Sequence, residues 1–183
     1  MIALDGGVVF LVGLVVFGLL VLLSGFRVIP NDRVGIVEKR FSEKGSIKTG
    51  LIALHGEAGF QPQVLRGGIH FRTPFQYQIH TMPLVTIPQG KIGYVFARDG
   101  ETLGATQALA SNVKARDFQD VEDFLRNGGQ RGPQRQILRE GTHAINLAQF
   151  VVVTEGQVFY LPLNDSEDAT FKQMAYTIQD RDG

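Results

Sequence analysis

The sequence contains no cysteine and no tryptophan among its 183 residues, and it carries no excess charge of either sign. Without cysteine there are no disulfides, no thiolate chemistry and no zinc sites that use cysteine. The 18 basic and 18 acidic residues balance, so the basic footprint of most nucleic-acid-binding proteins is missing, and we expect no nucleic-acid partner. The 22 glycines and short Val/Ile-rich runs favour many turns and short strands.

Recognisable catalytic motifs are also missing. The sequence has no G-x-S-x-G, H-E-x-x-H, P-loop or dinucleotide G-x-G-x-x-G pattern. No two of the four histidines stand three or four residues apart, the spacing that would suggest a metal site. We therefore predict a protein that is not an enzyme, with no catalytic residues, metal or cofactor. A membrane-anchored enzyme is the less favoured alternative.

One long apolar run is present, from Gly6 to Phe26, with no charged residue in it. Its length matches the ~20 apolar residues that a helix needs to cross a bilayer. A cleaved signal peptide is less favoured because no basic region precedes the run, and a buried core helix because the run has no polar face. We predict an uncleaved anchor over residues 1–29, with its transmembrane part at about 6–26.

Basic residues follow this anchor but do not precede it. Arg27, Arg33, Lys39 and Arg40 come soon after it, whereas only Asp5 and the amino terminus lie before it. Basic residues are retained on the cytoplasmic side. We therefore predict a single-pass protein of the plasma membrane whose remaining part is cytoplasmic.

A motif of the form Gln-x-Leu-Arg-x-Gly-x-His occurs twice. Its residues are Gln63, Leu65, Arg66, Gly68 and His70 in the first copy, and Gln136, Leu138, Arg139, Gly141 and His143 in the second. An earlier pair, 29–37 and 87–95, also matches, in the same order. Two matching pairs in one order favour a tandem duplication. The glycine suits a turn, and we interpret the histidine as a repeated structural hydrogen bond rather than a ligand.

The predicted fold class is α+β: a transmembrane helix followed by a duplicated, small β-rich unit with one or two short helices. The first unit covers 30–85 and the second 86–163, and a helix and tail are predicted over 164–183. The clearest soluble helix is predicted at about 117–127, capped by Asp117 and ended by Gly128-Gly129. An apolar stripe predicts the last helix over 165–178, and 149–161 is predicted to form a strand pair.

The anchor followed by residues 29–37 and then 64–75 resembles the start of the SPFH (band 7) domain of stomatins, prohibitins and flotillins. The resemblance covers roughly 8–160 and is nearest to bacterial flotillin-like proteins whose opening is repeated. The second copy departs from the pattern, with Leu147-Ala148 in place of Pro-Phe. The family's long coiled coil is absent, so the sequence is compatible with an N-terminal fragment of a longer protein.

This resemblance implies a non-enzymatic membrane scaffold that forms homo-oligomers and organises membrane microdomains or neighbouring membrane proteins. A prohibitin-like regulator of a membrane-bound protease is the alternative. The expected partners are the lipid bilayer, further copies of the chain, and other membrane proteins or a membrane protease. The candidate lipid-headgroup contacts are Arg27, Arg131 and Arg135. For the last two, a solvated loop balanced by nearby acidic residues is the favoured alternative.

Overall fold

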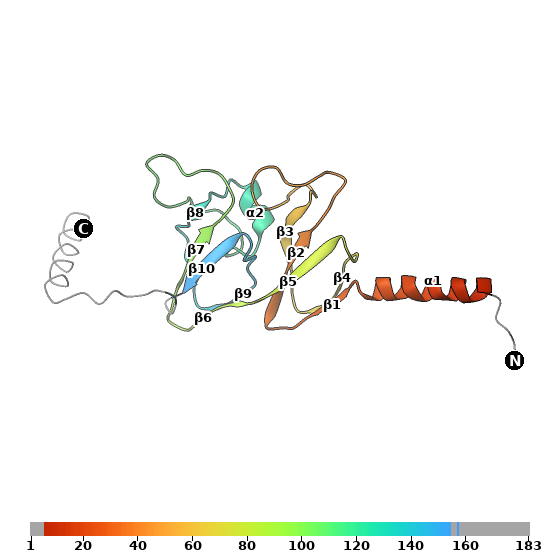
Figure 1. Cartoon of the computed structure of the whole chain (residues 1–183). Coiled ribbons are helices and arrows are strands. Elements are labelled where there is room, and N and C mark those ends of the chain that lie inside the picture. Colours follow the sequence, from red (N-terminus) through yellow and green to blue (C-terminus); the bar gives the residue numbers. More distant parts are fainter. Residues whose placement is uncertain (1–5, 155–156, 158–183) are drawn as a thin grey trace, which may run out of the picture.

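The computed structural model describes residues 6–154 and 157. In that part of the chain an apolar helix is followed by short strands and one further short helix, an α+β arrangement (Figure 1). The elements in order are α1 Gly6–Leu23, β1 Phe26–Ile29, β2 Arg33–Lys39, β3 Gly59–Leu65, β4 Gly68–Phe71, β5 Tyr77–Pro83, β6 Val85–Ile87, β7 Gly93–Ala97, α2 Val121–Arg126, β8 Gly132–Pro133, β9 Gly141–His143 and β10 Phe150–Thr154.

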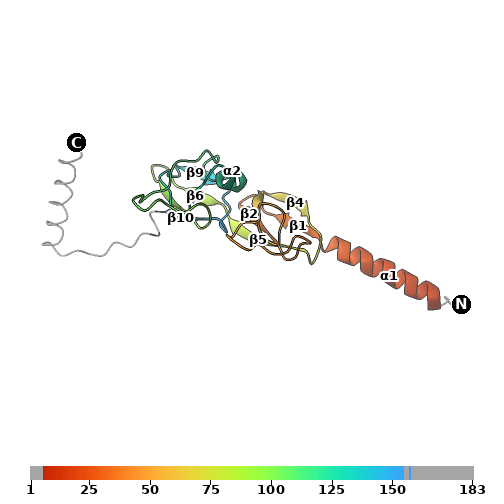
Figure 2. The same ribbon diagram turned by 90° about the horizontal axis from the view of Figure 1, so that it is seen from above.

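Helix α1 projects from one end of the β-rich body and buries none of its residues (Figures 1 and 2). It is long and apolar enough to cross a membrane, since its 18 residues span about 27 Å at ~1.5 Å per residue, close to the ~30 Å of a bilayer's hydrocarbon core. The helix is shorter than the transmembrane span predicted at about 6–26. The helix ends at Leu23, where the Ser24 hydroxyl donates to the Val21 carbonyl at 2.7 Å, and Phe26 already belongs to β1.

The strands next to α1 form a three-stranded antiparallel sheet, in the order β3-β2-β5, and a two-stranded ribbon, β1-β4. Pro30 closes the turn between β1 and β2, because its carbonyl accepts from the Arg33 amide at 3.1 Å. One core cluster joins the ribbon to the sheet. Its members are Ile29, Val37 and Leu65, with Tyr77 and Ile79 packed against them.

The remaining strands form a second three-stranded sheet, in the order β10-β7-β8, and a second ribbon, β6-β9. Their core contains three phenylalanines, Phe118, Phe124 and Phe150, whose ring centroids lie 5.0 to 6.3 Å apart. Ile52, from the long loop between β2 and β3, is buried in the same cluster. The loop of the first sheet therefore contributes to the core of the second, and Figure 2 shows α1 and the two sheets in a row.

The short helix differs from the prediction of about 117–127. It begins at Val121, and its N-cap is Asp120, whose carboxylate accepts from the Asp123 amide at 3.0 Å. Asp117 cannot start the helix because it has a φ of 54° and lies in a tight turn. Gly128, with a φ of 77°, follows the helix as expected. The helix predicted over 165–178 and the end of the strand pair predicted over 149–161 lie outside the described residues.

Candidate functional site

The repeated motif forms the same turn at both of its positions. Gly68 and Gly141 have φ values of 139° and 134°, which favour glycine. The Nε2 atom of His70 lies 2.6 Å from the Arg66 carbonyl oxygen, and that of His143 lies 3.1 Å from the Arg139 carbonyl oxygen. Each imidazole thus closes the turn that leads into a ribbon strand, which is a structural task.

The other motif residues pack or make contacts between segments. Leu65 and Leu138 are buried, each in the core of its own sheet. The Gln63 amide donates to Glu122 at 3.0 Å and the Arg66 guanidinium donates to Gln119 at 3.0 Å, whereas Gln136 donates to Asp117 at 2.9 Å. Gln63 and Arg66 therefore join the first sheet to α2 and the residue before its cap. None of these contacts forms a nucleophile–base pair.

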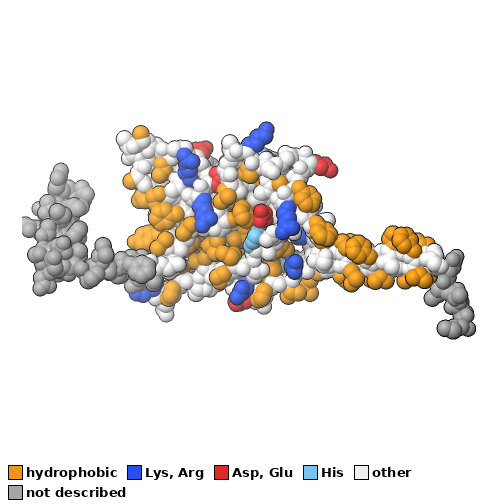
Figure 3. Space-filling model, in the orientation of Figure 1, with side chains coloured by type: hydrophobic (Ala, Val, Ile, Leu, Met, Phe, Trp, Pro, Cys, Tyr) orange, Lys and Arg blue, Asp and Glu red, His pale blue; other side chains and the backbone are white. Residues whose placement is uncertain are grey.

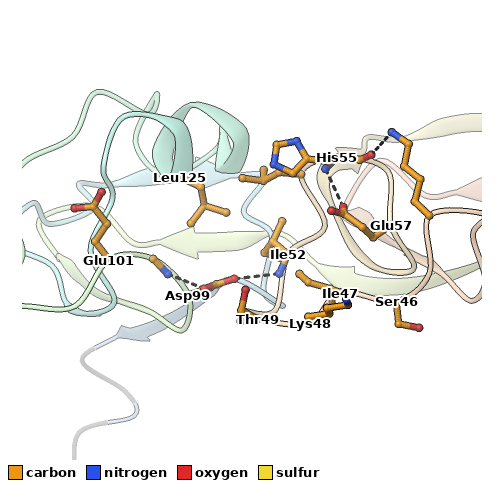
Figure 4. A pocket seen from close by; sticks show the side chains of 13 residues that line it. Ser46, Ile47, Lys48, Thr49, Ile52, His55, Glu57, Asp99, Glu101 and Leu125 are labelled. Carbon is orange, nitrogen blue, oxygen red and sulfur yellow. Dashed lines mark hydrogen bonds between the residues drawn. The ribbon is translucent and has the colours of Figure 1, made fainter.

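A cleft of about 520 Å³ lies between the long loop after β2 and the turn after β7 (Figure 4). The Asp99 carboxylate accepts from the amides of Leu51 and Ile52 at 2.6 and 3.1 Å, and also from that of Gly100 at 2.8 Å. Lys44 donates to the His55 carbonyl at 2.7 Å. The charged groups of Asp99 and Lys44 are therefore occupied by backbone partners, and Asp99 joins the turn after β7 to the long loop after β2.

Glu57 on the wall of this cleft is held in the same way. Its own amide and that of His55 donate hydrogen bonds that lower the pKa of the carboxyl group below its usual range. An ionised carboxylate that stabilises its own loop is not poised for proton transfer at neutral pH. In the described residues, no group of three or more His, Asp and Glu side chains could hold a metal ion.

Sequence reasoning missed two buried polar residues, and one of them, Asn146, joins the two sheets. Asn146 is fully buried; its amide donates to the carbonyls of Gln61 and Pro62 at 3.0 and 3.3 Å, and its oxygen accepts from the Ala148 amide. Gln149 donates to the Asp99 carbonyl at 2.8 Å. No local sequence signal distinguishes these amides from exposed ones, because their burial depends on contacts with residues that are distant in the sequence.

The surface next to α1 is the strongest candidate for function. In the β1–β4 ribbon, Phe26 lies opposite Phe71 and Val28 opposite Ile69, so all four side chains share one face. Val28 and Ile69 are 73% and 72% exposed, and the rings of Phe26 and Phe71 lie 5.0 Å apart. An exposed apolar face of this kind, directly after an apolar helix, suits contact with a membrane. Its sequence signal is the alternation in 26–28 and 69–71.

Gly25 fixes this ribbon relative to α1. It is buried, its carbonyl accepts from the Arg72 amide at 3.0 Å, and a Cβ placed on it would lie 2.6 Å from both the Arg72 carbonyl oxygen and the Phe71 ring. Such distances leave no room for a side chain. The helix and the ribbon therefore meet in one defined geometry.

The three arginines predicted to contact lipid headgroups do not lie together. Arg27 is in β1, beside the end of α1. Arg131 and Arg135 flank β8, which lies at the end of the body away from α1 (Figure 1). Arg131 also donates to the Thr102 hydroxyl at 3.3 Å. If α1 crosses a bilayer, only Arg27 of these three is at headgroup level.

No family model, curated protein or solved structure matches the chain in the comparisons made with each.

Proposed function

We propose that this chain is a membrane-anchored, non-enzymatic scaffold of the SPFH (band 7) type. The observation that carries the proposal is the continuity between α1 and the β1–β4 ribbon, whose apolar face is exposed beside the end of the helix. An anchor alone could carry any soluble domain. A ribbon held by Gly25 and displaying Phe26, Val28 and Ile69 supports a further step, in which the body lies directly on the bilayer surface.

We further propose that the body is a tandem duplication, as the resemblance implies. The order of pairing supports this: β1 with β4 corresponds to β6 with β9, and β2 with β3 and β5 corresponds to β7 with β8 and β10. Gly35 and Gly93 add a second argument. A Cβ on Gly35 would meet Ile29, Ile79 and Leu65. A Cβ on Gly93 would meet the equivalent side chains, Ile87, Val152 and Leu138.

A scaffold role also requires copies of the chain to associate and to gather lipids or neighbouring proteins. The exposed face of the second sheet supports association. Tyr94 and Phe96 alternate with buried residues along β7, and Val151 lies opposite Phe96 on β10. Their side chains form an apolar surface on the body, of a kind that marks interaction sites.

Membrane contact by the ribbon can be tested with single-cysteine labelling, since the natural sequence has no cysteine. We would attach a fluorophore at Val28→Cys and, as the control, at Leu109→Cys on the second half of the body. Both positions are exposed. In vesicles containing brominated lipids, we expect strong quenching at position 28 and little at position 109. Equal, weak quenching at both would contradict the proposal.

The predicted orientation needs a separate experiment. A reporter that is active only in the cytoplasm, fused after Gly183, is expected to be active. Activity of a reporter that works only outside the cytoplasm would overturn the charge-based topology and leave the anchor itself in place. Self-association is tested by measuring the size of the detergent-solubilised chain. We expect an oligomer, and a monomer would contradict the proposed association.

A further inference from the structure

A second cleft, of about 390 Å³, lies at the root of α1 and is lined by three arginines. Arg27 comes from β1, Arg40 follows β2, and Arg72 follows β4. Ser24 and Gly25, in the turn that ends the helix, form part of the same wall. Figure 3 shows basic side chains on the body beside the root of the apolar helix. Pairing of β1 with β4 and of β2 with β5 brings these distant residues together.

The positive charge of this cleft is not neutralised by the protein. No acidic residue lines it, and no ion pair joins Arg27, Arg40 or Arg72 to a carboxylate in the described part of the chain. Glu38 is the carboxylate on the adjacent part of β2, and it lies 2.7 Å from His80 Nε2 instead. The three guanidinium groups therefore leave a cleft with a strong preference for an anion.

Neutral partners orient two of these arginines. Arg40 donates from Nε and Nη2 to the Gln78 side-chain oxygen at 3.2 and 2.7 Å. Arg72 donates from Nη1 to the Phe71 carbonyl at 3.0 Å. Each guanidinium keeps further N–H groups free of these bonds, because the group carries five. Arginine's planar group is well suited to phosphate, to which it can donate two parallel hydrogen bonds.

The cleft lies at the depth where a bilayer has its phosphate groups. Helix α1 is about as long as the hydrocarbon core is thick, and the cleft begins at Ser24, one residue after the helix ends at Leu23. Headgroup phosphates lie just outside the hydrocarbon. Side chains at the root of the helix thus meet this layer when α1 crosses the membrane.

Phe75, on the loop between β4 and β5, supplies an independent observation. Its φ of 67° is unfavourable for a bulky residue, and its side chain is 67% exposed while lining the cleft. Strained residues of this kind gather at ligand sites, where the surrounding structure holds them in place. An aromatic ring held outward beside arginines suits the boundary between headgroups and acyl chains.

We propose that Arg27, Arg40 and Arg72 bind the phosphate of an anionic phospholipid in the leaflet that the body faces, with Phe75 inserted beside its acyl chains. The site gathers anionic lipid around each anchor. This inference rests on the membrane anchoring proposed above. It replaces Arg131 and Arg135 as headgroup contacts with two arginines that the sequence did not single out.

The test uses the full chain in nanodiscs that contain equal amounts of phosphatidylglycerol and phosphatidylcholine. After mild detergent extraction, the lipids that remain bound are counted by native mass spectrometry. We expect phosphatidylglycerol to be retained severalfold over phosphatidylcholine. The Arg27→Gln/Arg72→Gln variant should lose about fivefold of this preference per arginine, whereas Arg131→Gln/Arg135→Gln should retain it. Phe75→Ser should weaken retention of both lipids without changing the charge.

Three outcomes overturn the inference. The first is equal retention of the two lipids by the natural sequence, and the second is equal loss in the two double-arginine variants. The third is displacement of the lipid by millimolar inorganic phosphate, which would assign the cleft to a soluble anion. In each of these cases the chain remains in the nanodisc and the proposed anchor stands. A chain that fails to enter the nanodisc at all contradicts both proposals.

Discussion

Glycine at positions 35 and 93 is required by close packing, not by backbone freedom. Neither residue has a positive φ, yet a Cβ on Gly35 would lie 2.5 Å from Ile29 Cδ1, and one on Gly93 would lie 2.8 Å from Ile87 Cδ1. In each case the central strand of a sheet passes directly under the isoleucine of a ribbon. A single added methyl group must therefore displace a buried side chain.

The Gly93→Ala variant is expected to lose about 1 to 3 kcal/mol of stability, because overpacking forces off-rotamer side chains. Thermal unfolding in detergent, followed by circular dichroism, would measure this as a lower Tm. Gly104→Ala is the matched control, since the nearest atom to its added Cβ is 3.6 Å away. An unchanged Tm in Gly93→Ala would mean that the ribbon yields to the methyl group.

The side chain of Asn146 is fully buried and makes three hydrogen bonds to backbone groups. Replacing it with alanine removes the donor to Gln61 and Pro62 and the acceptor for Ala148. We expect a loss of about 2 to 4 kcal/mol, since each buried group left unpaired costs roughly 1 to 3 kcal/mol. Asn112→Ala, at an exposed position, should be nearly neutral in the same unfolding experiment. Similar Tm values for the two variants would contradict a joining role for Asn146.

At the level of elements, α2 shows how a cap is selected by tertiary structure. Two aspartates precede the helix, and both are chemically able to cap it. Only Asp120 has the extended conformation a cap requires, with φ −115° and ψ 96°. Asp117 instead lies in the left-handed region, with a φ of 54°, and the next residue, Phe118, is buried against Phe150.

The Asp120→Ala variant should therefore lose about 0.5 to 2 kcal/mol through loss of the cap. Asp117→Asn provides the comparison, since asparagine tolerates a positive φ and can still accept from Gln136. It should lose less than Asp120→Ala when the two are unfolded by urea in parallel. A larger loss in Asp117→Asn than in Asp120→Ala would instead favour Asp117 as the cap, as the sequence predicted.

At the level of the whole molecule, an α1 that crosses the membrane, as proposed above, would restrict how copies of the chain can meet. A helix across the bilayer aligns every copy with the membrane normal, so neighbours make contact at equal height above the membrane. The second sheet lies farther from α1 than the first (Figure 2). Its apolar surface of Tyr94, Phe96 and Val151 would then meet the second half of a neighbouring copy.

Tyr94→Ser/Phe96→Ser is accordingly expected to shift the detergent-solubilised chain from oligomers towards monomers. Light scattering coupled to size-exclusion chromatography would follow the shift. Phe41→Ser, at another exposed phenylalanine on the first half of the body, is the matched control and should leave the mass unchanged. Oligomers of unaltered mass in the double variant would place the contact elsewhere on the chain.

Features that depend on local chemistry and on length could be predicted from the sequence. The apolar helix follows from a run long enough for hydrocarbon, and the strand breaks follow from proline and glycine at 30, 68 and 141. The equal spacing of Gln, Leu, Arg, Gly and His in 63–70 and 136–143 predicted two turns of one kind, and in both turns the histidine contacts the carbonyl of the arginine four residues before it.

Which polar groups are buried, and which charged side chains lie together, depends on the tertiary structure. Nothing in the sequence around Asn146 marks it as buried, and its side chain is covered only because the first sheet packs against it. Arg27, Arg40 and Arg72 lie far apart along the chain, and only antiparallel pairing of β1 with β4 and β2 with β5 places them around one cleft. Contacts between distant residues depend on register and packing, which local sequence patterns do not specify.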